Sequence, residues 1–162
     1  PGEMPEAVTA DGLVRALQER LGPRGQGRLD VRVDDAGPPV VVPVQALTMV
    51  LANLVHNGLD ALGSNTHTAV RLVVRGDPEA VSFLVEDDGI GMAPDVLARA
   101  GEPFFTTKGP NAGMGLGVFL ARGVAESLGG ALALESVQGR GTTVTLRVPR
   151  APGRPRTAGG AP

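Results

Sequence analysis

The chain has 162 residues, 42% of them hydrophobic and 20% charged, with a formal net charge of −2 at pH 7. These values are typical of one globular domain with a core, and the lack of a basic excess predicts no nucleic acid partner. The chain has no cysteine and two histidines, which excludes disulfides and leaves no donor set for zinc. No apolar run approaches the ~18 residues of a membrane span and no signal peptide is visible, so we expect no membrane contact by this fragment.

The spacing of apolar residues predicts helices and strands in separate runs. The stretch "ADGLVRALQERL" has helical periodicity and is followed by Gly22 and Pro23, which end helices. "RLDVRV" alternates as a strand does, and "GDPE" has the composition of a hairpin turn. The expected elements are a helix over 10–21, a strand over 28–33, an extended piece over 38–43, a helix to about 62, strands over 68–76 and 80–87, helices over 93–100 and 114–130, and strands over 131–136 and 142–149.

This order of elements favours an α+β fold over a doubly wound parallel sheet. We expect two layers, a mixed and mostly antiparallel sheet with helices on one face. Residues 1–150 suit a single domain. Residues 151–162 contain three Gly and three Pro and no large apolar side chain, which predicts a flexible tail. The chain begins at Pro1 rather than Met, so we expect a piece of a longer protein.

One expected helix carries polar residues that a buried helix should lack. It includes "LANLVHNGLDAL", residues 51–62, whose leucines continue an apolar stripe. Asn53, Asn57 and Asp60 recur at four and three residues, so they share another face of the same helix. Asn and Asp are poor helix formers because their side chains compete for backbone hydrogen bonds. Three of them in a line need a reason other than helix formation.

Two glycine motifs offer sites for a ligand. In "VEDDGIGMAPD", residues 85–95, a carboxylate at a strand end faces Gly89 and Gly91 and could accept a hydrogen bond from an amino group. In "GMGLGVFLAR", residues 113–122, glycines run into a helix whose N–H groups suit phosphate. The second motif is neither a P-loop nor a Rossmann turn. Taken singly, an ordinary Asp-Gly turn is the better interpretation of the first motif, and helix packing through small residues is the alternative for the second, which is weak alone.

Two more stretches give only weak evidence of a function when each is considered alone. "EPFFTTK", residues 102–108, has two Phe that could anchor a loop to the core and the only lysine of the chain, Lys108. "GRGTTV", residues 139–144, reads as a hairpin turn that ends in Thr142.

In this order and spacing, the five motifs resemble those of the Bergerat-type ATP-binding fold, shared by gyrase, Hsp90, MutL and sensor histidine kinases. "NLVHNGLDA" resembles the N box, "DDGIG" the first glycine box, "EPFFTTK" the F box, "GMGLG" the second glycine box and "GRGT" the last. The resemblance covers residues ~10–149, nearly the whole chain. The F box is most similar to that of histidine kinases, so the resemblance implies their catalytic ATP-binding domain.

The resemblance implies roles for the polar residues. Asn57 would be the Mg²⁺ ligand and Asn53 would face the phosphates of ATP. Asp60 would lie at the pocket edge. Asp87 would accept the adenine amino group, with Thr142 supporting it through a water. Mg²⁺ keeps several waters and is shared with phosphates, so one protein oxygen can suffice.

The resemblance also implies a lid over residues ~93–113, with Lys108 at the phosphates. Asn53, Asn57 and Lys108 would be the catalytic residues. The other residues that it implies around ATP are Gly89, Gly91, Met92, Thr106, Thr107, Gly113, Met114, Gly115, Leu116 and Gly117.

One residue separates a kinase from a hydrolase. Gyrase, Hsp90 and MutL carry a Glu four residues before the Mg²⁺ Asn, where it activates water. This chain has Asn53 there, and an amide cannot act as a general base. Anti-sigma Ser kinases also tend to carry the Glu. We therefore favour a histidine kinase, with a Bergerat-type ATPase, an anti-sigma-type Ser kinase or a non-catalytic nucleotide-dependent interaction module as alternatives.

The phosphate acceptor is expected on another domain. His56 lies inside the N box and His67 follows it, and neither has the sequence context of an acceptor histidine. We expect His56 to be a solvated helix residue. The resemblance implies a two-component phosphorelay, in which a dimerisation domain of the parent kinase carries the acceptor and a response regulator receives the phosphate. We expect a cytoplasmic domain, monomeric in isolation, with a parent that an inner-membrane anchor could hold.

Overall fold

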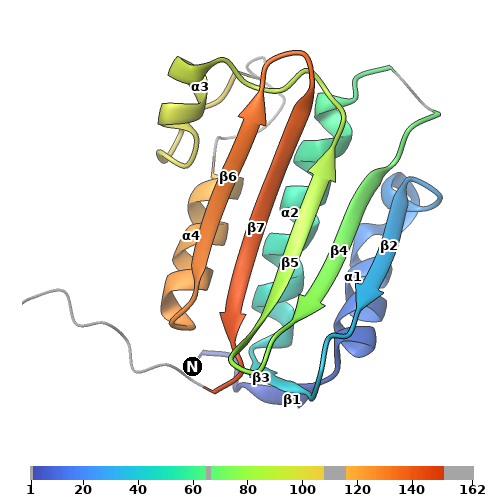
Figure 1. Ribbon diagram of the computed structural model, residues 1–162, viewed down its shortest axis with the longest axis vertical. Helices are drawn as coiled ribbons and strands as arrows, with labels where there is room; N and C mark the ends of the chain where they lie inside the picture. Colours follow the sequence, from blue (N-terminus) through green and yellow to red (C-terminus); the bar gives the residue numbers. More distant parts are fainter. Residues whose placement is uncertain (1, 65–66, 108–115, 152–162) are drawn as a thin grey trace, which may run out of the picture.

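The computed structural model describes residues 2–64, 67–107 and 116–151 (Figure 1). The expected tail beyond 151 lies outside the described residues, as do Lys108, Gly113, Met114 and Gly115. The elements are β1 (Glu6–Val8), α1 (Ala10–Gly25), β2 (Leu29–Asp34), β3 (Val40–Val42), α2 (Val44–Ala61), β4 (Val70–Gly76), β5 (Ala80–Asp87), α3 (Pro94–Arg99), α4 (Gly117–Ser127), β6 (Ala131–Val137) and β7 (Gly141–Pro149).

Five strands form one sheet in the order β2-β4-β5-β7-β6. β2 and β4 are parallel, and the other three pairs are antiparallel. The predicted mixed, mostly antiparallel α+β fold is therefore confirmed. The register places Asp87, at the end of β5, opposite Thr142 near the start of β7. Asp87 and Thr142, which are far apart in the sequence, thus lie side by side at the same end of these two strands.

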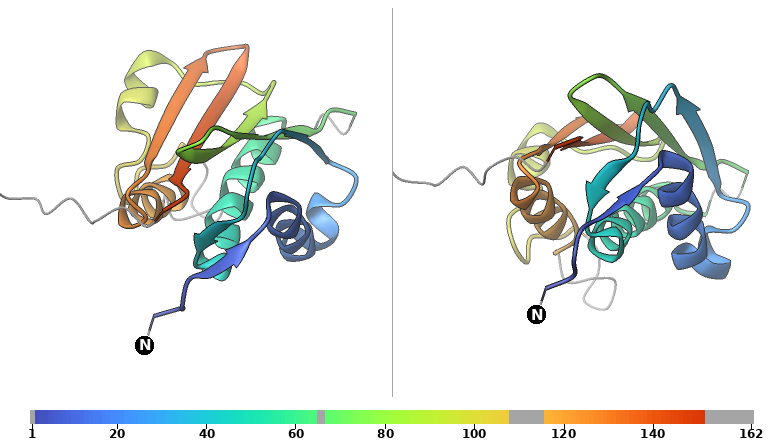
Figure 2. Two further views of the ribbon diagram at one scale, coloured as in Figure 1. Left: turned by 60° about the horizontal axis from the view of Figure 1, so that its bottom comes forward. Right: turned by 90° about the horizontal axis from the view of Figure 1, so that it is seen from below.

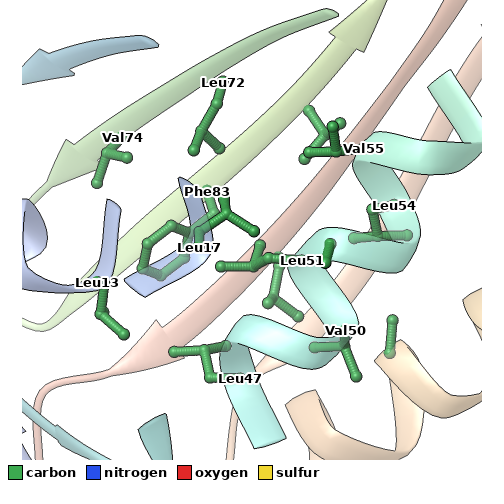
Figure 3. Close-up of a cluster of buried hydrophobic side chains, with 14 of the residues drawn as sticks. Leu13, Leu17, Leu47, Val50, Leu51, Leu54, Val55, Leu72, Val74 and Phe83 are labelled. Carbon is green, nitrogen blue, oxygen red and sulfur yellow. The ribbon is translucent and has the colours of Figure 1, made fainter. Parts of the chain in front are cut away.

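Helices α1, α2 and α4 lie on one side of this sheet (Figure 2). Alternate residues of β5, among them Phe83 and Val85, are buried against them, because side chains of a strand point to opposite faces in turn. Leu17 of α1 and Leu47 of α2 are fully buried in the same cluster (Figure 3). The apolar stripe predicted for α2 is confirmed, since each of its members is at most 8% exposed: Leu47, Val50, Leu51, Leu54 and Leu62.

The N-terminal segment was not predicted from the sequence. β1 pairs antiparallel with β3, and the Glu3 carboxylate accepts hydrogen bonds from the backbone N–H groups of Gln45 and Ala46 at 2.7 and 2.9 Å. A carboxylate at this end satisfies N–H groups that the first turn leaves without partners. It therefore caps α2, whose N-cap residue is Pro43.

The first helix extends past the predicted end. Gly22 leaves helical geometry there, with φ of 58°, and a further turn follows to Gly25.

None of the helices in the described part of the chain has the length and hydrophobicity of a membrane-spanning segment.

Candidate nucleotide site

A pocket of about 570 Å³ lies between α2, the end of β5, α4 and the segment that contains α3. Its volume is in the range of small-molecule and cofactor sites. Most of the described residues that the sequence assigned to the site line it: Asn53, Asn57, Asp60, Asp87, Gly91, Met92, Thr106, Thr107, Leu116, Gly117 and Thr142. The structure thus brings together three of the five motifs, along with the described parts of the F box and of the second glycine box.

The polar face of α2 forms one wall of this pocket. Asn53, Asn57 and Asp60 are half-buried and line it, while the opposite face of the helix is in the core. Asp60 also forms an ion pair with Arg24, which lines the pocket from the last turn of α1. His56 lines the pocket too and is half-buried, so the expectation of a solvated histidine is wrong. His56 lies one turn after Asn53 in the same helix and shares the pocket with both Asn residues.

The N-terminus of α4 abuts these asparagines. A Cβ atom on Gly117 would lie 3.3 Å from Asn57 Nδ2 and 3.7 Å from Asn53 Cβ. The N-cap residue is Leu116, whose side chain cannot accept a hydrogen bond. The first N–H groups of a helix and its positive dipole end attract anions. Amide side chains and backbone donors therefore share this end of the pocket.

At the other end, Asp87 is buried, with 8% of its surface exposed. Its Oδ1 accepts a hydrogen bond from the backbone N–H of Gly89 at 2.9 Å. Burial raises the pKa of this carboxyl, and the negative charge of Asp88 adds to the rise. Backbone hydrogen bonds from Gly89 and Thr142 and the charge of Arg71 act in the opposite direction. Asp87 is thus a shielded acceptor held by backbone donors.

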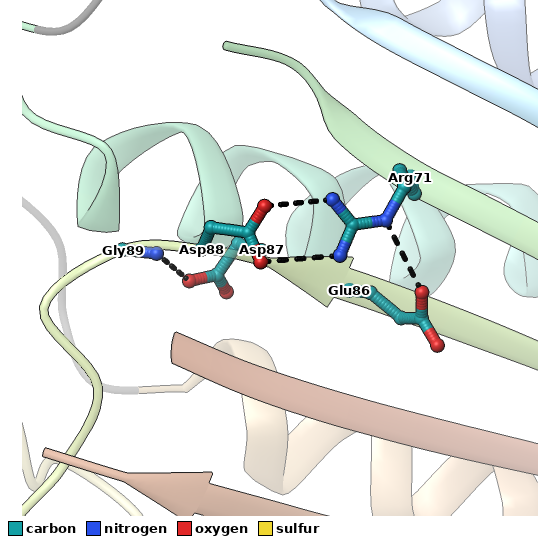
Figure 4. Close-up of polar contacts among 5 residues, drawn as sticks. All are labelled: Arg71, Glu86, Asp87, Asp88 and Gly89. Carbon is teal, nitrogen blue, oxygen red and sulfur yellow. Dashed lines mark hydrogen bonds and ion pairs between the residues drawn. The ribbon is translucent and has the colours of Figure 1, made fainter. Parts of the chain in front are cut away.

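Arg71 binds two neighbouring carboxylates, those of Asp88 and Glu86, as Figure 4 shows. Its Nη1 and Nη2 donate to Oδ2 and Oδ1 of Asp88 at 2.8 and 3.2 Å, and its Nε donates to Glu86 at 3.3 Å. The Arg71 side chain holds the pKa of Asp88 below its usual range. Sequence reasoning missed Arg71, because its role depends on the pairing of β4 with β5, in which it lies opposite Glu86.

The turn after β5 is packed against backbone on two sides. A Cβ atom on Gly89 would lie 2.5 Å from the Ala61 carbonyl oxygen at the end of α2. Gly91 has φ of 63°, and a Cβ atom there would lie 2.1 Å from the Val137 carbonyl oxygen. Gly91 lines the pocket, whereas Gly89 packs against α2. Both glycines are required by the fold itself.

The F-box segment contributes one aromatic ring to the pocket. Phe105 is half-buried and lines it, with the Arg99 guanidinium 4.2 Å from the ring centroid. Phe104 is 71% exposed and has φ of 64°, so it does not anchor the loop to the core. Thr106 and Thr107 are exposed and line the pocket.

The donor set suits a metal that a ligand shares. Within residues 2–64, 67–107 and 116–151, no group of three or more His, Cys, Asp or Glu side chains could hold a metal ion. The amide oxygen of Asn57 is a hard ligand of the kind Mg²⁺ accepts. A magnesium ion here would need further oxygens from a bound ligand and from water, and the pocket beside the N-terminus of α4 has space for them.

Together, a two-layer α+β sandwich and a pocket with a buried acceptor at one end and anion-binding groups at the other define a nucleotide-binding domain. Residues 43–152 match the model of a protein family described as histidine kinase-, DNA gyrase B-, and HSP90-like ATPase. The chain belongs to this family. ATP binding and the fold that the motifs implied are thereby confirmed.

Sensor kinases are among the relatives of this chain. The chain is 38% identical to the sensor protein kinase FleS of Pseudomonas aeruginosa over 97% of its length, and 33% identical to sporulation kinase E of Bacillus subtilis over 76%. It spans 39% and 16% of those proteins. These relatives support the predicted identity, an ATP-binding domain of a two-component sensor histidine kinase.

Solved structures agree. Full-length ShkA, crystallised in complex with AMPPNP, has a TM-score of 0.78 and 25% identity, with 94% of this chain and 32% of that chain covered. The catalytic domain of the histidine kinase ThkA, in a nucleotide-free form, has a TM-score of 0.77 and 23% identity, and covers 91% of this chain and 97% of that one. The second likeness concerns the fold alone.

Proposed function

We propose that this domain binds Mg-ATP and donates its γ-phosphate to a histidine on a separate domain of the parent kinase. The observation that carries the proposal is the meeting of Asn53 and Asn57 with the N-terminus of α4, in a pocket whose other end holds Asp87. The buried Asp87 carboxylate would accept the adenine amino group. The helix N-terminus and the amides would then face the triphosphate, since both ends belong to one pocket.

Asn57 would hold the magnesium ion together with the phosphates. The bound ion supplies charge neutralisation for the transferred phosphoryl group. The absence of a side chain at Gly117 leaves room for the Asn57 amide at the start of α4, so that amide and the first N–H groups of the helix would face one volume. Lys108 would add a cation to the phosphates, although it lies outside the described residues.

Asn53 favours transfer to a protein over hydrolysis. An amide cannot take a proton from water, so hydrolysis lacks general-base help that is usually worth ~10²–10⁴-fold. Phosphoryl transfer depends mostly on positioning and charge neutralisation, which the pocket supplies. A response regulator would receive the phosphate next, as the two-component relatives suggest. Because ATP is the donor, the proposal places the domain in the cytoplasm.

The test is transfer to a supplied acceptor. The chain is incubated with γ-labelled Mg-ATP and a separately purified dimerisation hairpin of a sensor kinase, and acid-labile phosphate on the hairpin and free phosphate are both counted. We expect labelled hairpin and little free phosphate from wild type, and neither from Asn57→Ala. In EDTA, Asn57→Ala should affect ATP binding much less than it does in Mg²⁺, because only the metal bridge is lost.

Two outcomes would contradict the proposal. Hydrolysis by the isolated chain at a rate comparable to transfer would favour an ATPase. Nucleotide binding without transfer to several different hairpins would favour a non-catalytic interaction module. Asn53→Glu, which restores the carboxylate of the hydrolases, should raise hydrolysis if that carboxylate reaches the attacking water.

A further inference from the structure

Ser136 lies near the end of β6. It connects the turn at Met92 with Thr142 at the base end of the pocket, which is the end that contains Asp87. Its Oγ accepts a hydrogen bond from the backbone N–H of Met92 at 2.8 Å. The same oxygen lies 3.0 Å from the Gly141 carbonyl oxygen and 2.8 Å from Thr142 Oγ1. Met92 and Thr142 line the pocket, and Ser136 contacts both of them. No sequence motif includes Ser136.

The protons in this cluster can be assigned by counting. Each of the two short oxygen–oxygen contacts of Ser136 needs a proton between its atoms. The Gly141 carbonyl has no proton, so the Ser136 hydroxyl must donate to it. The contact between Ser136 and Thr142 must then use the proton of Thr142. Ser136 therefore accepts from Met92 and Thr142 and donates once, to Gly141.

This assignment determines whether the Thr142 hydroxyl acts as a donor or an acceptor toward the pocket. Its only proton is directed at Ser136, so it presents lone pairs alone toward the pocket. Asp87, opposite Thr142 in the register of β5 and β7, also presents acceptors. Two acceptors side by side favour a ligand group that donates hydrogen bonds and repel a carbonyl.

We propose that Ser136 is a positioning residue for base recognition: it makes Thr142 an obligate acceptor and fixes the Gly91–Met92 turn, so that the pocket selects an exocyclic amino group. This inference rests on the proposed binding of ATP. The hairpin reinforces the turn through a second hydrogen bond, from the Gly139 N–H to the Ile90 carbonyl at 2.7 Å. Removal of the Ser136 hydroxyl would release the Thr142 proton toward the pocket and leave the Met92 N–H without its acceptor.

The test compares ATP with inosine triphosphate, which has a carbonyl in place of the amino group. Calorimetry of the full chain in Mg²⁺ gives both dissociation constants for wild type, Ser136→Ala and Ser136→Thr. We expect Ser136→Ala to weaken ATP binding about 5–10-fold and to leave inosine triphosphate binding nearly unchanged, as expected for one buried hydrogen-bond partner. Ser136→Thr keeps a hydroxyl and should restore the discrimination.

The ratio of the two affinities separates positioning from a loss of stability, because both ligands report on the same folded protein. Ser127→Ala is the matched control, since Ser127 Oγ donates only within α4, to the Val124 carbonyl at 2.8 Å. A Ser136→Ala variant with the wild-type ratio would overturn the proposal, and so would a Ser136→Thr variant as unselective as Ser136→Ala.

A second readout needs no nucleotide. Amide hydrogen exchange at Met92 should be faster in Ser136→Ala than in wild type, while the amides of β5 should be unchanged. If wild type binds neither nucleotide, the proposed function fails, and the exchange of Met92 still decides whether Ser136 fixes the turn. If wild type binds ATP and Ser136→Ala alters neither readout, only the role of Ser136 is wrong.

Discussion

The two ends of the pocket are built from different kinds of structure. At the base end, the Asp87 carboxyl is held by backbone N–H groups, and the following turn is enclosed by the end of α2 and by the β6–β7 hairpin. The phosphate end is lined by Asn53 and Asn57, one helical turn apart on α2, and by the start of α4. The exposed Thr106 and Thr107 line the same pocket. Backbone hydrogen bonds between strands fix a site before a ligand arrives. Side chains on a helix and an exposed segment can adjust to one.

This difference predicts that the base end is rigid and intolerant of substitution, whereas the phosphate end is completed by ligand and metal. Under the proposed function, a rigid acceptor would give selectivity for the base, and an adjustable phosphate end would let the γ-phosphate reach a second domain.

The largest effect is expected at Gly91. Gly91→Ala would combine a left-handed backbone with a Cβ atom 2.1 Å from the Val137 carbonyl oxygen, so the turn must separate from the hairpin. We expect it to lower the free energy of unfolding by ~3 kcal/mol or more and to abolish ATP binding. Gly139→Ala is the control, because its φ of 80° is also left-handed but no atom lies within 4 Å. It should cost only ~1–2 kcal/mol. Equal urea midpoints for the two variants would contradict a closely packed base end.

Asp87→Asn should abolish most base recognition while the protein stays folded. Asn loses the charge and presents a donor where an acceptor is needed, which typically costs ~1.5–3 kcal/mol, or roughly 10–150-fold in affinity. Calorimetry of ATP binding measures it. Asp88→Asn is the comparison, since Asp88 is exposed and is directed to Arg71, and it should cost less. Unchanged affinity in Asp87→Asn would remove Asp87 from the site.

At the phosphate end, Gly117→Ala should have a smaller effect. The added Cβ atom would lie 3.3 Å from Asn57 Nδ2, so the amide must shift by a few tenths of an ångström. We expect ATP affinity in Mg²⁺ to fall ~3–10-fold, with a smaller loss in EDTA. Gly123→Ala, on the same helix with no atom within 4 Å, should keep the affinity and stabilise the protein by ~0.5–1 kcal/mol. A loss as large as that of Gly91→Ala would mean that both ends are equally rigid.

The smallest effect concerns pH. In the proposed site, the ionised Asp87 carboxylate accepts the adenine amino group. Burial raises the pKa of this carboxyl, so ATP affinity should fall as the pH drops through that raised pKa. Arg71→Gln removes a cation that lowers this pKa and leaves Asp88 without its partner, so the midpoint of the affinity profile should move to higher pH. Arg75→Gln on the same strand, where Arg75 pairs with Asp34, is the control and should not shift the midpoint. Coincident profiles for all three proteins would exclude an influence of Arg71 on Asp87.

Without nucleotide, the same pKa acts on stability with the opposite sign. The folded state holds the Asp87 proton to higher pH than the unfolded chain does. The contribution of this group is therefore most favourable below the ordinary carboxyl pKa and is lost as the pH rises through the raised value. Asp87→Asn should remove this part of the pH dependence of unfolding while it weakens ATP binding.

By itself the sequence determined the helices, most strands, the fold class and most of the pocket. These depend on local periodicity: the 3.6-residue repeat of α2 places its leucines in the core and its Asn and Asp residues on another face, whatever surrounds the helix. The spacing of the motifs then carried the resemblance to the nucleotide-binding family. The sequence did not predict β1, because this strand has only three residues and is stabilised by its pairing with β3.

Only the tertiary structure decided which residues support the site. Ser136 contacts Met92, 44 residues away in the chain, and Arg71 of β4 contacts Asp88, which follows the neighbouring strand β5. Such contacts depend on which strands pair and in which register, since the pairing carries the turn after β5 to its neighbours. A sequence does not display this, because the register is chosen by the packing of all strands together. Phe104 shows the same limit, since its left-handed backbone turns an apolar side chain outward where composition predicted an anchor. Local periodicity thus places the groups that line the pocket, and long-range pairing decides how firmly each is held.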